Sequence, residues 1–440
     1  MRVMTKPQLF VVGGIALVAL FFILVFTGVI PGLQTNQPDT VKASLSMWGV
    51  GDSAAAYEAA FGEFKKSYPA VTVSYRSFEN EEDYENALIE AFASGSAPDI
   101  FMIANRNFPQ YANKIAPIPS ERISMLEMQS LFPEVVRQDF VSKGRDGISY
   151  AFALPLSIDT LALVYNRDFF NASGIVTMPT TWETFKHIVP QLIKKDANKR
   201  ITRAAAAIGG SETSIKNASD ILSLLMLQSG TKMTNPEFTA ATFGSDEGAN
   251  ALSFYIQFAD PLNDVFTWND AMPYSLDAFG QEKTAMAFAY AHDVAEIEKA
   301  SPFLNFSIAP MPQPEGLVDI GKAVNYASYS GYAVPRQSVQ KDLAQAFIVM
   351  MTTNREVARA YADMTKKPPA LIALSGAFSD DIRLSVFARQ TLTARSWPQI
   401  NASMITSIFS EAIKDAVSKK TDAKSAVQQA ETKVNGFFRK

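Results

Sequence analysis

The sequence predicts an α/β fold of two lobes joined by crossing strands and preceded by one N-terminal transmembrane helix. Three observations lead to this prediction. The chain has 440 residues, enough for two lobes of ordinary size. Segments with strand and helix periodicity alternate along most of the chain and fall into two blocks. An uncharged apolar run, residues 9–30, stands near the N-terminus.

The apolar run follows two basic residues, Arg2 and Lys6. At about 1.5 Å per residue, a helix of this length crosses the roughly 30 Å hydrocarbon core of a bilayer. Basic flanks stay in the cytoplasm, so we expect residues 1–8 there and the rest of the chain on the extracytoplasmic side. A cleaved signal peptide is the alternative, although this run is longer than a usual signal core and no Ala-x-Ala-like site follows it. Residues 31–40 are polar, contain two prolines and predict a linker.

The first block alternates regularly between strand and helix. Its strand segments either alternate apolar and polar side chains or, in the third, form a nearly continuous apolar run typical of a buried parallel strand. Its helical segments space their apolar residues by three and four positions. The expected order is strand, helix, strand, helix, strand at residues 41–48, 54–68, 71–78, 81–95 and 99–104.

A pivot between the two blocks is expected within residues 151–166. This segment contains two apolar strand-like pieces separated by Pro155, which suits a crossing between lobes. The final part, residues 354–440, is expected to be mainly helical. Between these parts we expect helices at 181–195, 218–229, 245–259 and 337–351, and strands at 203–210, from 284, at 304–310 and at 331–335.

Composition excludes several classes of function. Lys and Arg number 40 and Asp and Glu 44, a net charge of −4, so nucleic acid is not an expected partner. The chain has no cysteine, which excludes disulfides, thiol nucleophiles and Cys-ligated metals. The two histidines, His187 and His292, lie too far apart for a local metal-binding pair. We therefore expect neither a metal nor a cofactor.

No sequence motif supports an enzyme. Gly316, Gly321 and Lys322 nearly match a phosphate-binding loop, but Ala323 stands where a Ser or Thr would ligate magnesium. The segment also precedes strand-like residues, whereas a phosphate-binding loop opens a helix. We expect a hairpin connection between strands there. Gly-x-Ser-x-Gly does not occur, so a nucleophile elbow has no support.

Polar and aromatic residues recur where the predicted strands end. Open α/β sheets bind ligands at the carboxyl ends of their strands. Aromatic faces beside planar polar groups suit a sugar ring, which stacks its apolar face and hydrogen-bonds through its hydroxyls. Core packing explains any one of these residues equally well, and only their recurrence favours a site. The residues are Trp48, Asp52, Ser53, Asn105, Arg106, Asn107, Tyr290, His292, Asp293, Tyr326, Tyr329, Tyr332 and Trp397.

Residues 148–185 carry a more specific signal. They read ISYAFALPLSIDTLALVYNRDFFNASGIVTMPTTWETF, an order of hinge strand, "YNKD"-like turn, "GI" pair and "P-x-TW" helix start. Shorter segments of the same kind are WGVGD (48–52), ASGSAPDIFMIANRNFPQYA (93–112), FGQEKTAMAF (279–288), LNFSIAPMP (304–312) and GYAVP (331–335). In these segments the chain, from about residue 41 to 437, resembles the extracellular solute-binding proteins of ABC importers, carbohydrate class, the family of maltose-binding protein.

The resemblance implies a periplasmic-binding-protein-like fold of type II, with a ligand in the cleft between two α/β lobes that close on binding. The expected N-terminal lobe comprises residues 41–154 and 311–365, and the C-terminal lobe residues 155–310 and 366–440. No catalysis is implied. The implied function is that of a receptor that delivers a sugar to ABC permease subunits. Together with the apolar run at residues 9–30, we expect a monomer anchored in the cytoplasmic membrane.

The resemblance also assigns ligand contacts position by position. They are Trp48, Asp52 and Ser53 in a first loop, Asn105, Arg106 and Asn107 in a second, Asp159 at the hinge and Glu212 in the second lobe. Where the maltose-binding relative has stacking tryptophans, this chain has Ile103, His292 and Met404, which argues against a maltodextrin. Tyr290, Tyr329 and Trp397 stand close by and are candidates for stacking on a different sugar.

Two alternatives remain open at this stage. The same fold could bind a polyamine through Asp52, Asp159 and Glu212, or an organic anion through Arg106. The chain could also serve as a ligand-sensing ectodomain, although only a few residues precede the apolar run.

Overall fold

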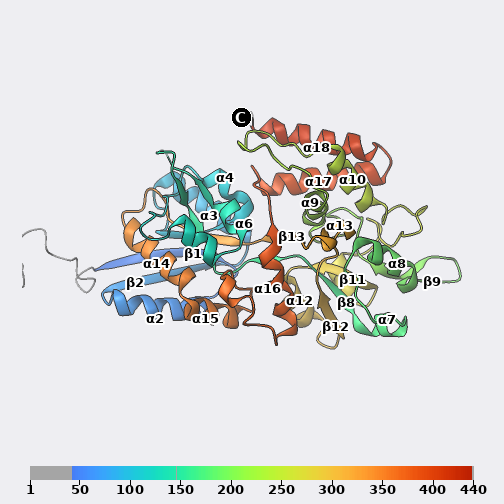
Figure 1. The fold of residues 1–440 in the computed structure, drawn as a ribbon, viewed down its shortest axis with the longest axis horizontal. Helices are drawn as coiled ribbons and strands as arrows, with labels where there is room; N and C mark the ends of the chain where they lie inside the picture. The colour runs from blue at the N-terminus through green and yellow to red at the C-terminus, as the bar shows by residue number, and fades with distance from the viewer. Residues whose placement is uncertain (1–41, 145, 439–440) are drawn as a thin grey trace, which may run out of the picture.

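Two lobes lie side by side along the long axis of the molecule (Figure 1) in a computed structural model that describes residues 42–144 and 146–438. Each lobe packs helices around its own sheet, which confirms the expected α/β fold of two lobes. The expected membrane helix, residues 9–30, and the linker, residues 31–40, lie outside the described residues. Within the described ranges, no helix is long and apolar enough to cross a bilayer.

The first lobe is built on a five-stranded sheet. Its strands run in the order β2 (Val71–Phe78), β1 (Ala43–Val50), β3 (Ile100–Ala104), β14 (Ser330–Ala333) and β6 (Ala153–Leu154). The first three strands are parallel, as the alternation over residues 41–104 predicts, and β14 is antiparallel to both of its neighbours. A two-stranded ribbon, β4 (Val141–Lys143) and β5 (Ser149–Ala151), adjoins it.

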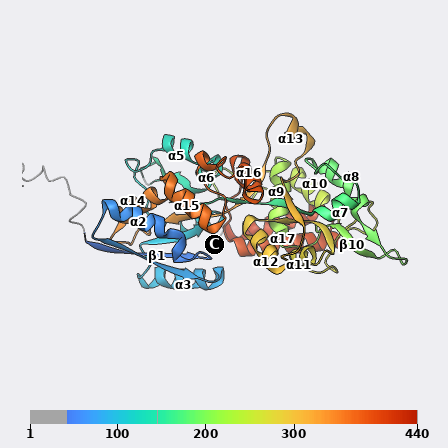
Figure 2. The same ribbon diagram turned by 90° about the horizontal axis from the view of Figure 1, so that it is seen from below.

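Helices cover both faces of the first sheet (Figure 2). They are α2 (Glu58–Ser67), α3 (Glu81–Ser94), α4 (Phe108–Tyr111), α5 (Met125–Leu131), α6 (Glu134–Phe140), α14 (Lys341–Thr353) and α15 (Arg355–Thr365). Helix α3, which forms one wall of the site described below, has clear sequence boundaries. The Asn80 side chain accepts a hydrogen bond from the Asp83 amide at its start, and Gly95 ends it with a φ of 75°.

The second lobe has its own five-stranded sheet, in the order β12 (Phe306–Ala309), β8 (Ala162–Asn166), β11 (Thr284–Ala289), β10 (Ile201–Ala206) and β9 (Lys194–Lys195). Its helices are α7 (Arg167–Ala172), α8 (Trp182–Leu192), α9 (Ala218–Gln228), α10 (Asp246–Ile256), α11 (Ser275–Gly280), α12 (Ala291–Ala300), α13 (Glu315–Asp319), α16 (Ile382–Gln390), α17 (Ala402–Val417) and α18 (Ala423–Phe438). The helix expected over 181–195 is shorter because its last residues pair with β10 as a strand.

A small sheet joins the lobes. Its strands run in the order β15 (Ala394–Arg395), β13 (Asn325–Ser328) and β7 (Asp159–Thr160). The crossing expected at Pro155 is confirmed, because the chain passes from β6 in the first sheet through β7 to β8 in the second. It returns from β13 to β14, and β15 lies on a further connection between the lobes. The three connections are thus hydrogen-bonded to one another at the hinge.

The two hydrophobic cores show which residues belong to which lobe. Met311 and Tyr326, placed in the N-terminal lobe by the sequence-based division, pack in the core of the second lobe. Ala370 and Leu371, placed in the C-terminal lobe, pack in the core of the first. The expected hairpin connection at the near match to a phosphate-binding loop is wrong, because the flanking strands β12 and β13 lie in different sheets. The segment does not form a phosphate-binding loop either, since α13 precedes Lys322 instead of following it.

Candidate functional site

The candidate site is a cleft between the lobes that has two adjoining compartments. The hinge compartment, of about 480 Å³, lies beside β7 and the first turn of α12. The α3–α17 compartment, of about 430 Å³, lies between α3 of the first lobe and the first turns of α17 of the second. Residues common to both are Val50, Glu81, Met102, Ala104, Arg106 and Ser330. Volumes of this order hold small organic solutes.

A carboxylate–imidazole pair forms one side of the hinge compartment. The Asp159 carboxylate accepts hydrogen bonds from the backbone amides of Thr160 (2.8 Å) and Ala291 (2.9 Å) and from Nδ1 of His292 (3.0 Å). Burial alone would lower the pKa of His292, but the hydrogen bond and charge of Asp159, with Asp293, raise it above its ordinary value. The imidazole remains about half exposed and faces the cleft.

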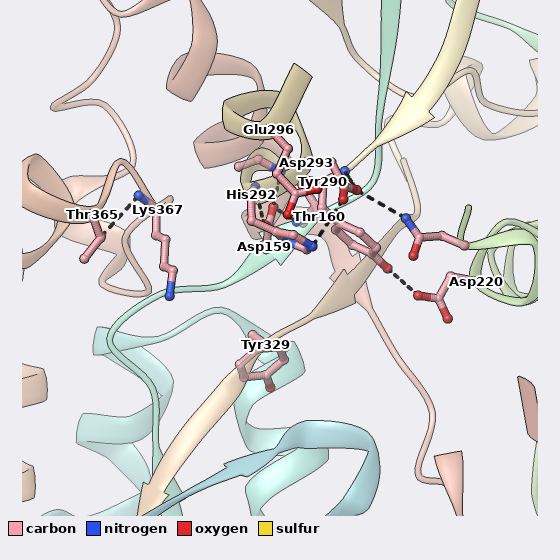
Figure 3. A network of polar contacts seen from close by, with 12 residues as sticks. Asp159, Thr160, Asp220, Tyr290, His292, Asp293, Glu296, Tyr329, Thr365 and Lys367 are labelled. Atoms are coloured by element: carbon pink, nitrogen blue, oxygen red, sulfur yellow. Dashed lines mark hydrogen bonds and ion pairs between the residues drawn. The ribbon is translucent and has the colours of Figure 1, made fainter. Parts of the chain in front are cut away.

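The ring of Tyr290 packs against the imidazole of His292. Its ring stacks on His292 with a centroid distance of 5.5 Å and an interplanar angle of 11°. The Tyr290 hydroxyl donates to Asp220 at 2.8 Å, and the side chain is only 2% exposed. Tyr290 therefore fixes the orientation of His292 and does not itself line either compartment (Figure 3).

Arg106 stands where the two compartments meet. It follows β3 in the first lobe, and its guanidinium lies 3.5 Å from the carboxylate of Asp220 on α9 of the second lobe. Burial lowers the pKa of Arg106, but Asp220 and smaller effects of nearby groups, Glu81 included, together raise it above its ordinary value, so the group stays cationic. A backbone hydrogen bond from the Gln399 amide to the Arg106 carbonyl, 3.0 Å long, also spans the lobes.

Lys367 reaches the hinge compartment from the loop after α15. Its Nζ donates to the Asp52 carboxylate at 2.7 Å, and that carboxylate also accepts from the hydroxyls of Tyr57 and Tyr361. Asp52 is buried, with an exposed fraction of 6%, and its hydrogen bond fixes the position of the Lys367 Nζ. Figure 3 shows Lys367, Tyr329 and the Asp159–His292 pair around a common space.

A second buried carboxylate organises the hinge. Asp139 on α6 accepts hydrogen bonds from Asn105 Nδ2 (2.9 Å), the Tyr329 hydroxyl (2.8 Å) and the Ser396 hydroxyl. Burial raises the pKa of Asp139 to about 6, although the three hydrogen bonds lower it. Asn105 and Tyr329 are thus held by Asp139, and Tyr329 presents part of its ring to the hinge compartment.

The structure brings six of the predicted site residues to the cleft surface. They are Arg106, Asn107, Asp159, His292, Tyr329 and Tyr332. A further three lie beneath this surface and hold lining residues in place: Asp52, Asn105 and Tyr290. The strand-end argument thus gathered the right loops, but it did not separate side chains on the surface from those under it.

Four more predicted site residues line neither compartment. Trp48 packs against Phe78 and the guanidinium of Arg76, and Ser53 is exposed at the start of a 3₁₀ turn. Glu212 accepts hydrogen bonds from the amide and hydroxyl of Ser219.

Trp397 is the fourth. It is 3% exposed, stacks on Phe409 at 6.0 Å and donates to the Ser223 hydroxyl. Its ring is enclosed by the second lobe, so it offers no face to a ligand in the cleft. Met404, at the position of another stacking tryptophan of the relative, also stays outside the lining.

Sequence reasoning missed several lining residues. Lys367 lies in a part of the chain expected to be mainly helical, although its Lys-Lys-Pro-Pro sequence signals a turn that exposes its cations. Glu85 and Glu296 also line the cleft, and no sequence pattern singled them out, because the facing lobe is distant in sequence. Among the described residues, no group of three or more His, Cys, Asp or Glu side chains could hold a metal ion.

Two α/β lobes, three hydrogen-bonded crossings and a polar cleft between the lobes define a protein that binds a small solute. The family model described as bacterial extracellular solute-binding protein matches residues 49–358. The chain belongs to this family, whose members bind solutes.

Solved structures share the fold. The cyclic α-maltosyl-1,6-maltose binding protein of Arthrobacter globiformis aligns with a TM-score of 0.74 and 19% identity, covering 91% of this chain and 100% of the other. The sugar-binding protein MalE of Xanthomonas citri aligns with a TM-score of 0.72 and 18% identity, covering 90% of this chain and 97% of the other. UgpB of Mycobacterium tuberculosis, in complex with glycerophosphocholine, aligns with a TM-score of 0.69 and 16% identity, covering 90% of this chain and 98% of the other. Comparison with curated protein sequences gives no match.

Proposed function

We propose that this protein is a membrane-anchored extracytoplasmic receptor that captures a carbohydrate in the interlobe cleft and delivers it to the permease of an ABC transporter. The observation that carries the proposal is the pair of adjoining compartments, whose walls come from both lobes. A ligand there contacts both lobes at once and so favours the closed arrangement. The neighbouring structures named for sugars support the choice of solute.

The chemistry of the cleft also suits a polyhydroxylated solute. Hydrogen-bond acceptors such as Glu81 face donors such as Arg106 and Lys367. A hydroxyl donates and accepts at once, so a sugar can satisfy both kinds of group. The half-exposed His292 and the ring of Tyr329 offer the flat surfaces on which an apolar sugar face could rest.

A calorimetric screen of the full-length protein against mono- and oligosaccharides, polyols and sugar phosphates tests the proposal. We expect at least one sugar to bind with a 1:1 stoichiometry and to raise the unfolding temperature. The carbohydrate assignment fails if no member of the panel binds.

The charged residues of the cleft favour one second candidate, a non-sugar solute with an amine or an anionic group. The glycerophosphocholine complex of UgpB is a structural precedent for a non-sugar solute on this fold. Spermidine and small dicarboxylates in the same screen distinguish this candidate from a sugar receptor. A sensing role is distinguished by its gene neighbours, since permease genes support transport and a histidine kinase gene supports sensing.

The anchor is proposed from residues 9–30, with the cleft on the extracytoplasmic side. We expect the mature protein to keep its N-terminus, to fractionate with membranes and to resist carbonate extraction. Release of a soluble form that begins within residues 31–40 would instead show a cleaved signal peptide.

A further inference from the structure

We propose that Asp220 is a specificity-determining residue that excludes anionic solutes from the cleft, because it neutralises Arg106 when the two lobes come together. This inference rests on the proposed function, because it says which carbohydrates the same cleft accepts. Asp220 itself lines neither compartment, so its effect on the solute passes through Arg106.

Arg106 is the cation that a solute in either compartment would meet. It belongs to the first lobe and lines both compartments, and 24% of its side chain remains exposed. A guanidinium in such a place is suited to bind a carboxylate or a phosphate through two parallel hydrogen bonds. Its charge would therefore favour an anionic solute unless another group neutralised it.

Asp220 supplies a neutralising charge from the second lobe. Its carboxylate lies 3.5 Å from the Arg106 guanidinium and forms no other ion pair within the described part of the chain. Asp220 is buried, so water screens the attraction between the two groups only weakly. It also stands in the first turn of α9, where the helix dipole favours a negative charge.

Two carboxylates of α3, Glu81 and Glu85, also act on Arg106. Both are exposed, so water screens their charges more than that of the buried Asp220. Burial lowers the pKa of Arg106, and among the charges that raise it, that of Asp220 has the largest effect. Asp220 is therefore the main neutralising group, and the α3 carboxylates act in the same direction.

The position of the pair on two lobes makes this neutralisation depend on closure. Arg106 follows β3 in the first lobe, and Asp220 lies on α9 in the second. An anion held by Arg106 would face the Asp220 carboxylate as the lobes approach, and the two negative charges would repel each other. An uncharged sugar leaves the ion pair in place. Closure therefore favours the uncharged solute.

The other cations that line the cleft within the described ranges offer an anion no better partner. Lys367 is paired with Asp52 at 2.7 Å, and His292 is paired with Asp159 at 3.0 Å. An anionic solute would have to compete with a carboxylate for each of these donors.

The variant Asp220→Asn tests this role because it removes the charge and keeps the shape. The amide oxygen of the variant can still accept from the Tyr290 hydroxyl, which donates to Asp220 at 2.8 Å (Figure 3). Glu134→Gln is the matched control, since it also removes a carboxylate that is paired with an arginine. Glu134 pairs with Arg395 at 3.3 Å, but this pair is exposed and Glu134 lines neither compartment.

Calorimetry on the full-length protein at neutral pH compares neutral sugars with the corresponding uronic acids, in which a carboxylate replaces a hydroxymethyl group. The pairs are glucose with glucuronic acid, galactose with galacturonic acid, cellobiose with cellobiouronic acid, and the tightest-binding sugar of the wider screen with its own uronic acid. We expect the unchanged protein to bind the neutral member of a pair about tenfold or more tightly, because like charges in the closed cleft repel.

Asp220→Asn should reduce this preference about tenfold or more through a gain in affinity for the acid, as for a hydrogen-bonded charged contact. Glu134→Gln should preserve the preference. Adding Arg106→Gln to Asp220→Asn should abolish the gain for the acid, because Arg106 supplies the charge that the acid binds.

A purely structural effect of Asp220→Asn would weaken both members of a pair alike, and an unchanged ratio of their affinities overturns the inference. Equal binding of sugar and acid by the unchanged protein, or a preference for the acid, overturns it without any variant and leaves the carbohydrate receptor intact. If no sugar of the wider screen binds, the proposed function itself fails and this inference falls with it.

Discussion

Asp139 offers a test of the hinge that needs no ligand. Its carboxylate is 6% exposed, accepts three hydrogen bonds and has no ion-pair partner within the described ranges. Its donors come from the end of β3, from the turn between β13 and β14 and from the segment after β15, so this one group ties the first lobe to two of the crossings. Its ionisation should therefore influence the stability of the whole hinge.

The sign of the effect follows from the direction of the shift. Burial raises the pKa of Asp139 from 3.8 to about 6, so the folded protein binds this proton more tightly than the unfolded chain. The contribution of Asp139 to the free energy of unfolding is therefore greatest in acid, and it is lost as the pH rises from about 4 to about 6. At 1.36 kcal/mol for each unit, a rise of about two units gives about 3 kcal/mol.

Urea unfolding of the full-length protein and of Asp139→Asn, at a series of pH values across this window, measures the effect. The amide does not titrate, so we expect the stability difference between the two proteins to change by about 3 kcal/mol from acid to neutral pH. Glu82→Gln, at an exposed position, is the control and should give no such change in this window. A flat difference for Asp139→Asn, or one with the opposite slope, would refute the reasoning.

Three further predictions concern the cleft. Asp159→Ala removes the acceptor that orients His292 and should weaken solute binding about tenfold or more in calorimetry. Lys322→Ala, at an exposed position outside the cleft lining, should leave binding unchanged, and the reverse pattern would contradict the placement of the site. Because the pKa of His292 is raised in the folded protein, its protonation should stabilise the fold fully below the ordinary histidine pKa, and this effect should vanish as the pH rises through the raised pKa. Unfolding temperatures of the unchanged protein and of His292→Gln measure this across the range, and a difference between them that does not vary with pH would contradict it. Lys367→Met leaves the buried Asp52 without its cation and should cost about 3 kcal/mol in urea unfolding, while adding Asp52→Asn should recover most of the loss; an unrecovered double variant would mean that packing, and not charge, is responsible.

Local sequence patterns were sufficient for the first strands and helices of the first lobe. Strands are visible in the sequence because the pattern of apolar residues depends on whether one face or both faces of a strand are buried. The structure has β1, β2 and β3 where residues 41–48 and 71–78 alternate and where residues 99–104 form an apolar run. Pro155 marked the first crossing because a proline between two apolar strands interrupts the ladder. Such features depend on a few neighbouring residues, so the sequence displays them directly.

The candidate site was predictable only as a set of loops. The strand-end argument placed Arg106 and His292 near one another, the resemblance added Asp159, and all three line the cleft. It also selected Trp397, whose ring is enclosed by the second lobe. Periodicity gives the face of a helix or strand, but a loop side chain has no period, so its direction depends on contacts that the sequence does not reveal.

By itself, the sequence determined the two-block α/β order, the pivot and the absence of thiol chemistry, because composition and short-range burial patterns are local properties. Only the tertiary structure decided which charges are paired. Asp139 obtains its donors from Asn105, Tyr329 and Ser396, which are between 34 and 257 positions away in the chain. Glu85 lines a compartment only because α17 of the other lobe lies opposite α3. Whether a carboxylate is a support, a ligand contact or a solvated surface group depends on what surrounds it in space, because burial and neighbouring charge set its energy.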